Sequence, residues 1–225
     1  ISDWSSQIAE EILSNPNEDW DDTPTQKIIE INDDTWELLE DWIPDVKRVF
    51  MTGGEPTIIK RNLDYINKII ETGYAKNIEL IFTTNATNVN KKFLEFGKKF
   101  KSVHFSVSID AVNDLANYIR FPSNWQTIKN NLNTIGQENH GVSINTTIQW
   151  LNMTRLNEMF EFIEEYVASK PKQFAGVWFQ LVTHPNYLDP INAPKFIKEK
   201  AIHDINIFLN TSTMLQDEKY SSILQ

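Results

Sequence analysis

The stretch VKRVFMTGGEP, at positions 46–56, decides the fold of this chain. The short apolar run at 46–51 predicts a strand, which leads directly into two adjacent glycines and then into an amphipathic helix. Gly53 and Gly54 allow backbone conformations that are closed to other residues, and they allow a ligand to come close. Glu55 is then held at the end of a strand, where α/β folds place their chemistry, and Pro56 stiffens the turn. The turn suits binding of a cationic amine, but a βα turn that needs glycine only for steric reasons would have the same sequence.

Strands and helices alternate from this stretch to the end of the chain. The pattern predicts strands at 46–51, 78–84, 103–110, 142–149 and 176–183, helices at 58–71, 90–100, 123–136 and 194–209, and a further helix capped by Thr154. Strands that are separated by single helices run parallel, with right-handed crossovers. The sequence therefore predicts a doubly wound sheet or a full or partial (β/α) barrel, in one domain that covers residues 46–225.

Two of these strands alternate apolar and polar residues along their whole length. The polar members are His104, Ser106, Ser108 and Asp110 in one strand, and Ser143, Asn145, Thr147 and Gln149 in the other. Since helices normally cover both faces of a parallel sheet, a fully polar face is more consistent with a wall that lines an open cavity. Thr83, Asn85, Gln180 and His184 extend this face on neighbouring strands. The sequence thus favours a barrel with an open, polar lumen over one that is filled by Val, Ile and Leu.

The composition indicates an ordinary globular protein. The chain has 225 residues, of which 40% are hydrophobic and 23% charged, as is typical of one α/β domain with its own core. No apolar run approaches the roughly 20 residues that span a membrane, and the first residues lack the basic start and apolar segment of a signal peptide. There is no cysteine, which excludes disulfides and cysteine-ligated metals within these residues. We therefore expect a cytoplasmic protein without membrane association.

Charge is concentrated in the first 45 residues. Of the net charge of −10, this segment contributes 14 acidic residues and one basic residue, Lys27. We interpret residues 1–45 as a separate acidic segment with two helices, at about 4–13 and 34–43, joined by a solvated acidic loop. The remaining residues carry a net charge of only +3, so no basic surface for nucleic acid is predicted.

The order of these elements and motifs resembles that of the radical S-adenosylmethionine (radical SAM) superfamily. Gly53-Gly54-Glu55-Pro56 follows the first strand, Thr84-Asn85-Ala86 ends the next, and residues 106–111 end the third. Tyr118-Ile119-Arg120 follows at the spacing of the family, and residues 145–149 with Asn152 resemble its next strand. The resemblance covers about residues 46–185. It implies an α/β fold, a partial (β/α)6 TIM-like barrel of parallel strands whose first strand is missing here.

The resemblance also implies which residues bind S-adenosylmethionine. Gly54 and Glu55, with their neighbours Gly53 and Pro56, would receive the amino group of the methionine moiety, and Arg120 would meet its carboxylate. Ser108 would face the ribose hydroxyls, with Thr83 or Asn85 nearby and Asp110 in the same motif, while Thr147 and the backbone near Val182 would lie beside the adenosine. Simpler roles are also open. Arg120 could be a surface ion-pair residue, Ser108 and Asp110 could cap a helix, and His184 could be an ordinary loop residue.

The chain departs from the family in its cysteines. Family members hold a 4Fe-4S cluster with a CxxxCxxC loop after their first strand, whereas this chain has none. Trp4 and the pair Ser5-Ser6 resemble the segment after the last cluster cysteine in members with an auxiliary domain of the twitch/SPASM type. We therefore expect the cluster ligands upstream of Ile1 and an auxiliary domain beyond Gln225. The chain alone is expected to be inactive, and no catalytic residue or metal ligand is assigned within it.

The resemblance implies that the full-length protein generates a 5'-deoxyadenosyl radical, which abstracts hydrogen from a peptide or small-molecule substrate in the lumen. A flavodoxin or ferredoxin would donate the electron. Two alternatives stay open. One is a degenerate, non-catalytic barrel that binds a ligand or a protein, which the absence of cysteine favours. The other is an unrelated metal-free lyase or aldolase, for which the strand ends offer Glu55, Asp110 and His184 but no lysine.

Overall fold

Five parallel strands form one sheet in the order β1-β2-β3-β4-β5. The computed structural model describes residues 32–137, 140–170 and 172–212. The strands are β1 (Arg48–Met51), β2 (Glu79–Thr84), β3 (Ser102–Ser108), β4 (Gly141–Ile148) and β5 (Phe174–Leu181). Because each strand pairs with the next one in the chain, every crossover turns the same way, and the sheet is singly wound. This order excludes the doubly wound alternative and is that of a partial barrel.

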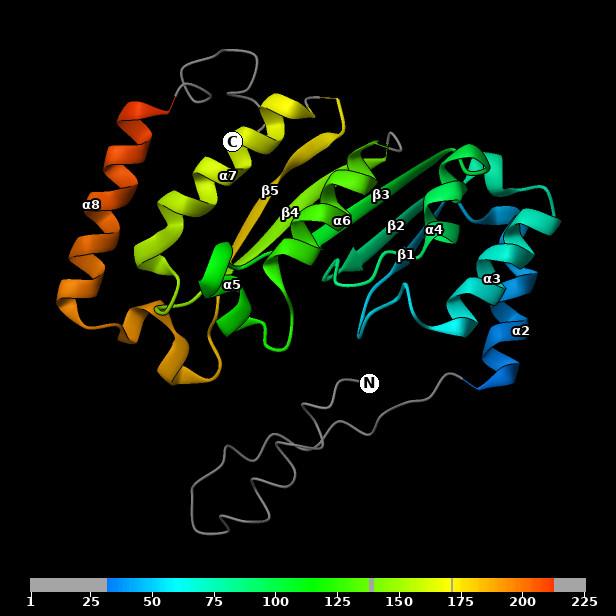
Figure 1. Ribbon diagram of the computed structural model, residues 1–225. Helices are drawn as coiled ribbons and strands as arrows, with labels where there is room; N and C mark the ends of the chain where they lie inside the picture. Colours follow the sequence, from blue (N-terminus) through cyan, green and yellow to red (C-terminus); the bar gives the residue numbers. More distant parts are fainter. Residues whose placement is uncertain (1–31, 138–139, 171, 213–225) are drawn as a thin grey trace, which may run out of the picture.

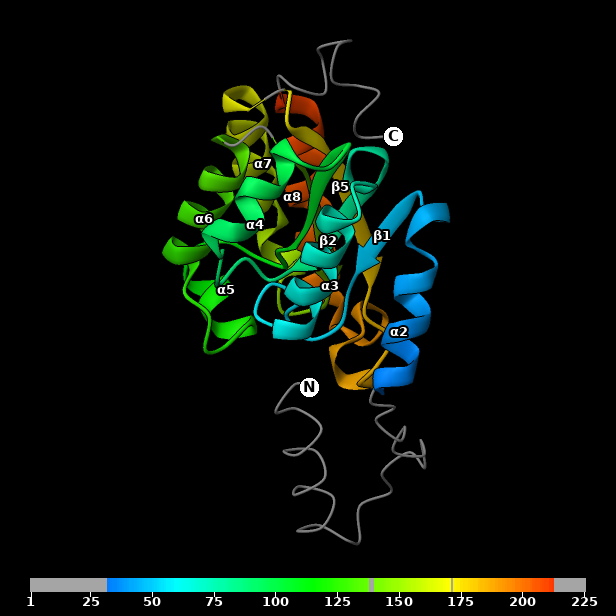
Figure 2. The same ribbon diagram turned by 90° about the vertical axis from the view of Figure 1, so that its right-hand side faces the viewer.

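Helices connect the strands and cover one face of the sheet. They are α2 (Asp33–Asp41), α3 (Lys60–Glu71), α4 (Lys91–Glu95), α5 (Asn113–Ile119), α6 (Trp125–Gln137), α7 (Leu156–Ser169) and α8 (Lys195–Thr211). Short 3-10 turns stand between them: η1 (Ile43–Asp45), η2 (Ala75–Asn77), η3 (Phe96–Lys98), η4 (Met153–Arg155), η5 (Asn186–Leu188) and η6 (Pro190–Asn192). Figure 1 shows α4, α6 and α7 over the strands, and Figure 2, turned by 90°, shows them together on one side of the sheet.

The hydrophobic core lies between the sheet and these helices. Phe82 of β2 stacks on Phe105 of β3 with ring centroids 5.3 Å apart, and it meets Phe93 of α4 edge-on at 5.2 Å. Ile66 of α3 and Ile144 of β4 are also fully buried. Burying one such side chain contributes about 1.5–3 kcal/mol, so this layer is the main source of stability. The apolar half of each alternating strand therefore points to the helices, as the sequence pattern predicted.

The polar half of each strand lies on the opposite face of the sheet. The parallel register places Thr83 beside Ser106, and Ser108 beside Asn145. Asn145 Nδ2 donates to Ser106 Oγ at 2.6 Å, and Gln180 Nε2 of β5 donates to Thr147 Oγ1 at 3.1 Å. Trp178 of β5 is 68% exposed and shares this face. The half-buried, hydrogen-bonded face matches the open polar wall that the alternation predicted.

The acidic segment meets the core through α2. Asn32 caps this helix by accepting from Thr35 N at 2.9 Å, and Trp36 packs on Tyr65 of α3 with ring centroids 5.6 Å apart. The helix predicted at 34–43 is thus present as α2, which ends at Asp41, two residues before the predicted end. The helix predicted at about 4–13 lies outside the described residues, and the domain division at residue 45 stays a prediction. Within the described ranges, no helix is long and apolar enough to cross a membrane.

Several predicted boundaries are wrong for local reasons. Thr154 does not cap α7, because the chain first makes the turn η4 and the helix begins at Leu156 with no side-chain cap. The third strand ends at Ser108 rather than at residue 110, because the Asp110 carboxylate bonds to groups outside the ladder. The helix predicted at 90–100 ends at Glu95 and continues only as η3. Helix α5 was not predicted, since its seven residues include the poor helix formers Asn113 and Asn117.

Candidate functional site

The turn after β1 holds the carboxylate of Glu55 in a fixed position. Gly53 and Gly54 have φ values of 86° and 57°, a region that disfavours any other residue. Glu55 Oε1 accepts from Thr57 Oγ1 at 2.6 Å and from Thr84 Oγ1 at 2.7 Å. Its Oε2 accepts from the Asn85 backbone N–H at 2.8 Å. Since a carboxylate oxygen has two lone pairs, Oε2 retains capacity for one further donor, such as an ammonium group.

The turn after β2 is strained and tightly held. Ala86 is fully buried and has a φ of 54°, a conformation that costs a residue other than glycine about 1–3 kcal/mol. Asn131 of α6 donates to the Ala86 carbonyl at 2.8 Å, and Thr84 Oγ1 accepts from the Ala86 N–H at 3.0 Å. The Asn85 side chain accepts from Thr87 N and Oγ1 at 2.9 and 2.6 Å. This held turn is the one whose Asn85 N–H donates to Glu55.

An ion pair lies beyond the end of β3. Asp110 Oδ2 accepts from Arg120 Nε at 2.7 Å, and Oδ1 accepts from the Thr147 backbone N–H of β4 at 2.8 Å. The Asp110 side chain is 8% exposed and that of Arg120 is 30% exposed. Asp110 does not cap the next helix, whose N-cap is Val112. Within the described part of the chain only the Nε of Arg120 has a partner, so its terminal nitrogens can bind an anion.

The Asn152 side chain bridges the segment after β3 and the end of β4 by hydrogen bonds. It is buried, and its Nδ2 donates to the carbonyls of Asp110 and Thr147 at 2.7 and 2.9 Å. Its Oδ1 accepts from the Gln149 N–H at 2.9 Å. The sequence motif contains Asn152, but no role followed from it. Only the fold shows that this amide fixes the loop that carries Asp110.

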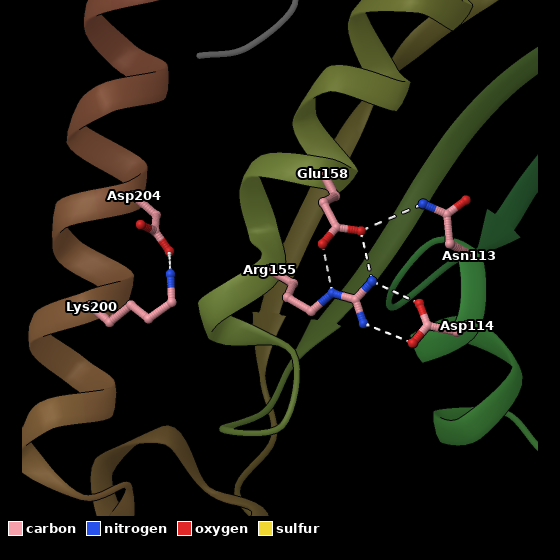
Figure 3. A network of polar contacts seen from close by, with 6 residues as sticks. All are labelled: Asn113, Asp114, Arg155, Glu158, Lys200 and Asp204. Atoms are coloured by element: carbon pink, nitrogen blue, oxygen red, sulfur yellow. Dashed lines mark hydrogen bonds and ion pairs between the residues drawn. The ribbon is translucent and has the colours of Figure 1, made fainter.

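Figure 3 shows how a second network places α5, the helix that leads to Arg120. Arg155 Nε donates to Glu158 Oε1 at 2.6 Å, and Arg155 Nη2 donates to Asp114 Oδ1 of α5 at 2.7 Å. These hydrogen bonds raise the pKa of Arg155, and the guanidinium lowers the pKa of Glu158 and of the exposed Asp114. The network ties α5 to α7 through charged groups that are partly open to solvent.

A cavity of about 1040 Å³ opens at the carboxyl ends of β2, β3 and β4. Three of the predicted binding residues, Asn85, Asp110 and Arg120, line it. Other lining residues come from the end of α5, from the loop between α5 and α6 and from the loops after β4 and β5: Tyr118, Ile119, Phe121, Pro122, Ser123, Asn124, Gln149, Leu151 and Leu188, with Thr87, Thr127 and Ile128. Most of these carry no sequence signal, because loop residues converge only through the tertiary fold.

The other predicted residues lie near the cavity edge of the sheet or on its polar face, not in the cavity lining. Glu55 is bonded to the N–H of the lining residue Asn85. Neither Glu55 nor its neighbours Gly53, Gly54 and Pro56 line the cavity. Thr83, Ser108 and Thr147 lie on the polar face, and the Val182 N–H donates to the Ile148 carbonyl at 2.9 Å just after β5. His184 is exposed. In the ranges that the structure describes, no group of three or more His, Asp or Glu side chains is placed to hold a metal ion.

Comparisons with known proteins bear on the family and the fold of this chain. The sequence matches the family model described as Radical SAM superfamily over residues 27–163, more than half of the chain. No curated protein matches the sequence significantly. The fold is similar to SuiB from Streptococcus suis bound to S-adenosylmethionine (TM-score 0.55, 14% identity, 80% of this chain and 41% of that one). It is also similar to SuiB bound to precursor peptide SuiA (TM-score 0.55, 16% identity, 78% of this chain and 38% of that one).

A third similar structure is native anSMEcpe with bound AdoMet (TM-score 0.55, 14% identity, 80% of this chain and 51% of that one). At such identities the likeness shows the fold alone, and it confirms the predicted partial barrel. The chain spans between about two fifths and one half of the length of these structures.

Proposed function

Because the chain belongs to the radical SAM superfamily, we propose that it is the core that binds S-adenosylmethionine at the carboxyl ends of its strands. The observation that carries this proposal is a pair of opposite charges at one edge of the sheet. Glu55 lies after β1 and accepts from the N–H of Asn85, and Asn85 lines the same cavity as Arg120, which lies beyond β3 and bonds to Asp110. An amino acid presents an ammonium and a carboxylate, so the pair is complementary to the methionine moiety.

The remaining predicted residues fit the rest of the same ligand. The positive φ values of Gly53 and Gly54 leave the backbone open to the ammonium group, and Pro56 fixes the turn. Ser108 and Thr83 offer hydroxyl groups to the ribose from the polar face. Thr147 and the backbone at Val182 lie at the ends of β4 and β5, where the adenosine would extend. Asp110 lines the same cavity and would act on the ligand mainly by orienting Arg120.

The residues of this chain do not fit the iron–sulfur cluster of the family. The sequence has no cysteine, and the described residues contain no cluster of three His, Asp or Glu side chains. We therefore propose that the 4Fe-4S cluster is held by residues outside this sequence, and we assign no step through it to this chain. When present, the cluster would supply reductive cleavage of S-adenosylmethionine to a 5'-deoxyadenosyl radical for hydrogen abstraction.

Further proposals concern the whole protein. An acidic segment at 1–45 would precede the barrel core at 46–225, and an auxiliary domain of the twitch/SPASM type would follow it. A peptide substrate is supported by the similar fold of SuiB, which is described with its precursor peptide, although a small molecule stays a candidate. A flavodoxin or ferredoxin would be the electron donor, in the cytoplasm.

One observation favours a second function. Absence of cysteine is also what a degenerate, non-catalytic barrel would show, in which the cavity binds a ligand or protein without chemistry. Anaerobic reconstitution of the full-length protein with iron and sulfide separates the two. We expect the absorbance of a 4Fe-4S cluster and formation of 5'-deoxyadenosine on reduction. Neither would form in a degenerate barrel.

Binding is tested separately, by titrating S-adenosylhomocysteine into the full-length protein in a calorimeter. We expect saturable binding, which Arg120→Gln weakens at least tenfold, because a fork of two charge-assisted hydrogen bonds is lost. Lys98→Gln, at an exposed position outside this cavity, is the control and should leave the affinity unchanged. A wild-type protein that does not bind S-adenosylhomocysteine would refute the proposed site.

A further inference from the structure

The outer edge of β5 is unpaired among the strands that the structure describes. β5 stands last in the sheet (Figure 1) and pairs only with β4. The Val182 N–H donates to the Ile148 carbonyl at 2.9 Å, and the bonds of a parallel ladder recur at every second residue. The even-numbered residues from 178 on therefore turn their N–H and C=O groups to β4, whereas Val177, Phe179 and Leu181 turn theirs outward. No described residue bonds to these outward groups.

This edge lacks the features that normally protect an edge strand. The sequence FAGVWFQL, at 174–181, contains no charged residue and no proline. Phe179 and Leu181 are 44% and 62% exposed, and Trp178 between β4 and the edge is also exposed. The strand at the other end of the sheet, β1, has only four residues and begins with Arg48. Because charges, prolines and short strands are what prevent an edge from pairing with another chain, the long neutral edge of β5 suits such pairing.

We propose that the free edge of β5 binds an extended peptide segment, which adds to the sheet as a further strand. The backbone pattern identifies this occupant. Three residues present a donor and an acceptor each at two-residue spacing, and an extended peptide backbone presents the complementary groups at the same spacing. The absence of charge along the edge, with Trp178 and Leu181 exposed, favours a neutral segment with apolar side chains.

An added strand would continue the polar face of the sheet. Side chains alternate between the two faces of a strand, so every second side chain of the peptide would lie beside Trp178 and Gln180. Gln180 Nε2 donates to Thr147 Oγ1 at 3.1 Å, which places this part of the edge next to the proposed ligand site. The inference thus deepens the proposed function and rests on it for the chemistry. This continuity favours a substrate peptide over a second copy of the chain, since a copy would block the approach to that face.

The probe is a neutral hexapeptide of alternating threonine and valine, with fluorescein at its amino end and an amide at its carboxyl end. Its binding to the full-length protein is measured by fluorescence anisotropy without any other ligand, and we expect it to saturate. Phe179→Pro removes one outward N–H and leaves the ladder to β4 intact. Phe179→Ala loses the same ring but keeps the N–H. We expect Phe179→Pro to bind the probe at least about fivefold more weakly than Phe179→Ala, the scale of one backbone hydrogen bond.

A second probe separates the backbone from the side chains. The same hexapeptide with every backbone amide N-methylated cannot donate to the edge, so we expect no measurable binding. Equal binding of the two probes overturns the inference, because side chains alone would then hold the peptide. Equal affinities of Phe179→Pro and Phe179→Ala overturn it as well, and so does a wild type that does not bind the first probe.

Misfolding and self-association are checked separately. If Phe179→Pro does not unfold cooperatively in urea, Leu181→Pro and Leu181→Ala repeat the comparison near the end of the strand, where the side chain is more exposed. A dimer in analytical ultracentrifugation that either proline variant dissociates would assign the edge to a second copy and overturn the peptide. Failure of the proposed function is distinguishable, since the wild type would then bind the hexapeptide but not S-adenosylhomocysteine.

Discussion

The backbone N–H of Asn85 donates a 2.8 Å hydrogen bond to Oε2 of Glu55 and thereby joins the turn after β2 to the turn after β1. Glu55 Oε1 accepts from Thr84 in the same turn, so both carboxylate oxygens are held from β2. The N–H of Asn85 therefore fixes the carboxylate, and the same residue lines the cavity that Arg120 also lines.

Replacing Glu55 should affect both stability and binding. In Glu55→Gln one carboxylate oxygen is replaced by an NH₂ group, which does not accept hydrogen bonds. The remaining oxygen cannot accept from the Asn85 N–H and from the two threonine hydroxyls at once. We expect the free energy of unfolding to fall by about 1–2 kcal/mol in urea titrations. We also expect at least tenfold weaker binding of S-adenosylhomocysteine, because the charge opposite its ammonium group is lost. Glu71→Gln, at an exposed position at the end of α3, should change stability by no more than about 0.5 kcal/mol.

Asp110 should matter mainly through the pair that it makes with Arg120. Asp110→Asn removes the charge on a carboxylate that is almost fully buried and that also bonds the Thr147 N–H. Breaking a buried pair costs about 3–5 kcal/mol, but Arg120 is partly exposed, so we expect a loss of about 2 kcal/mol by chemical denaturation. The comparison is Asp64→Asn, whose pair with Lys60 on α3 is exposed and should contribute less than about 0.5 kcal/mol. Equal losses in the two variants would contradict the assigned role of Asp110.

The Arg155 network should stabilise the contact between α5 and α7. In Arg155→Met two carboxylates lose their shared guanidinium partner (Figure 3). Because the groups are partly exposed, we expect thermal unfolding to show a loss of about 1 kcal/mol rather than the value of a buried pair. Lys200→Met removes only the i,i+4 pair with Asp204 within α8 and should cost less than about half as much. A larger effect for Lys200→Met would mean that α8, and not the network, limits stability.

His104 should make stability depend on pH. Burial lowers the pKa of His104 below the value of about 6.5 that it has in an unfolded chain. As the pH falls through about 6.5 the unfolded state takes up the proton first, so stability decreases until the pH passes the lower pKa of the folded state. We therefore expect a smaller free energy of unfolding at pH 5.5 than at pH 7.5.

His104→Gln should show a smaller difference between these two pH values. The glutamine side chain keeps polar atoms that can hydrogen-bond to Ser143 Oγ, which lies 2.9 Å from His104 Nε2, but it does not titrate. Urea titrations of both proteins at both pH values give the comparison. The same pH dependence in wild type and variant would show that another group is responsible.

The order of strands and helices was predictable because it rests on local patterns. The alternation in β3 and β4 predicted one apolar and one polar face, and the register confirms both. Boundaries were less predictable, because side-chain contacts across the sheet decide them. Asp110 leaves its strand to meet Arg120, and α7 starts two residues after Thr154 because Asn152 holds the preceding loop.

The sequence by itself determined the βα repeat, the glycine turn that carries Glu55 and the membership of a family, since these depend on residues close together in the chain. The tertiary structure decided which side chains meet. It joined Glu55 to Asn85 across 30 positions, paired Arg120 with Asp110, and gathered residues from the loops after β2, β3, β4 and β5 around one cavity. The physical reason is that hydrogen bonds and burial between distant segments exist only once the parallel strands bring their carboxyl ends together.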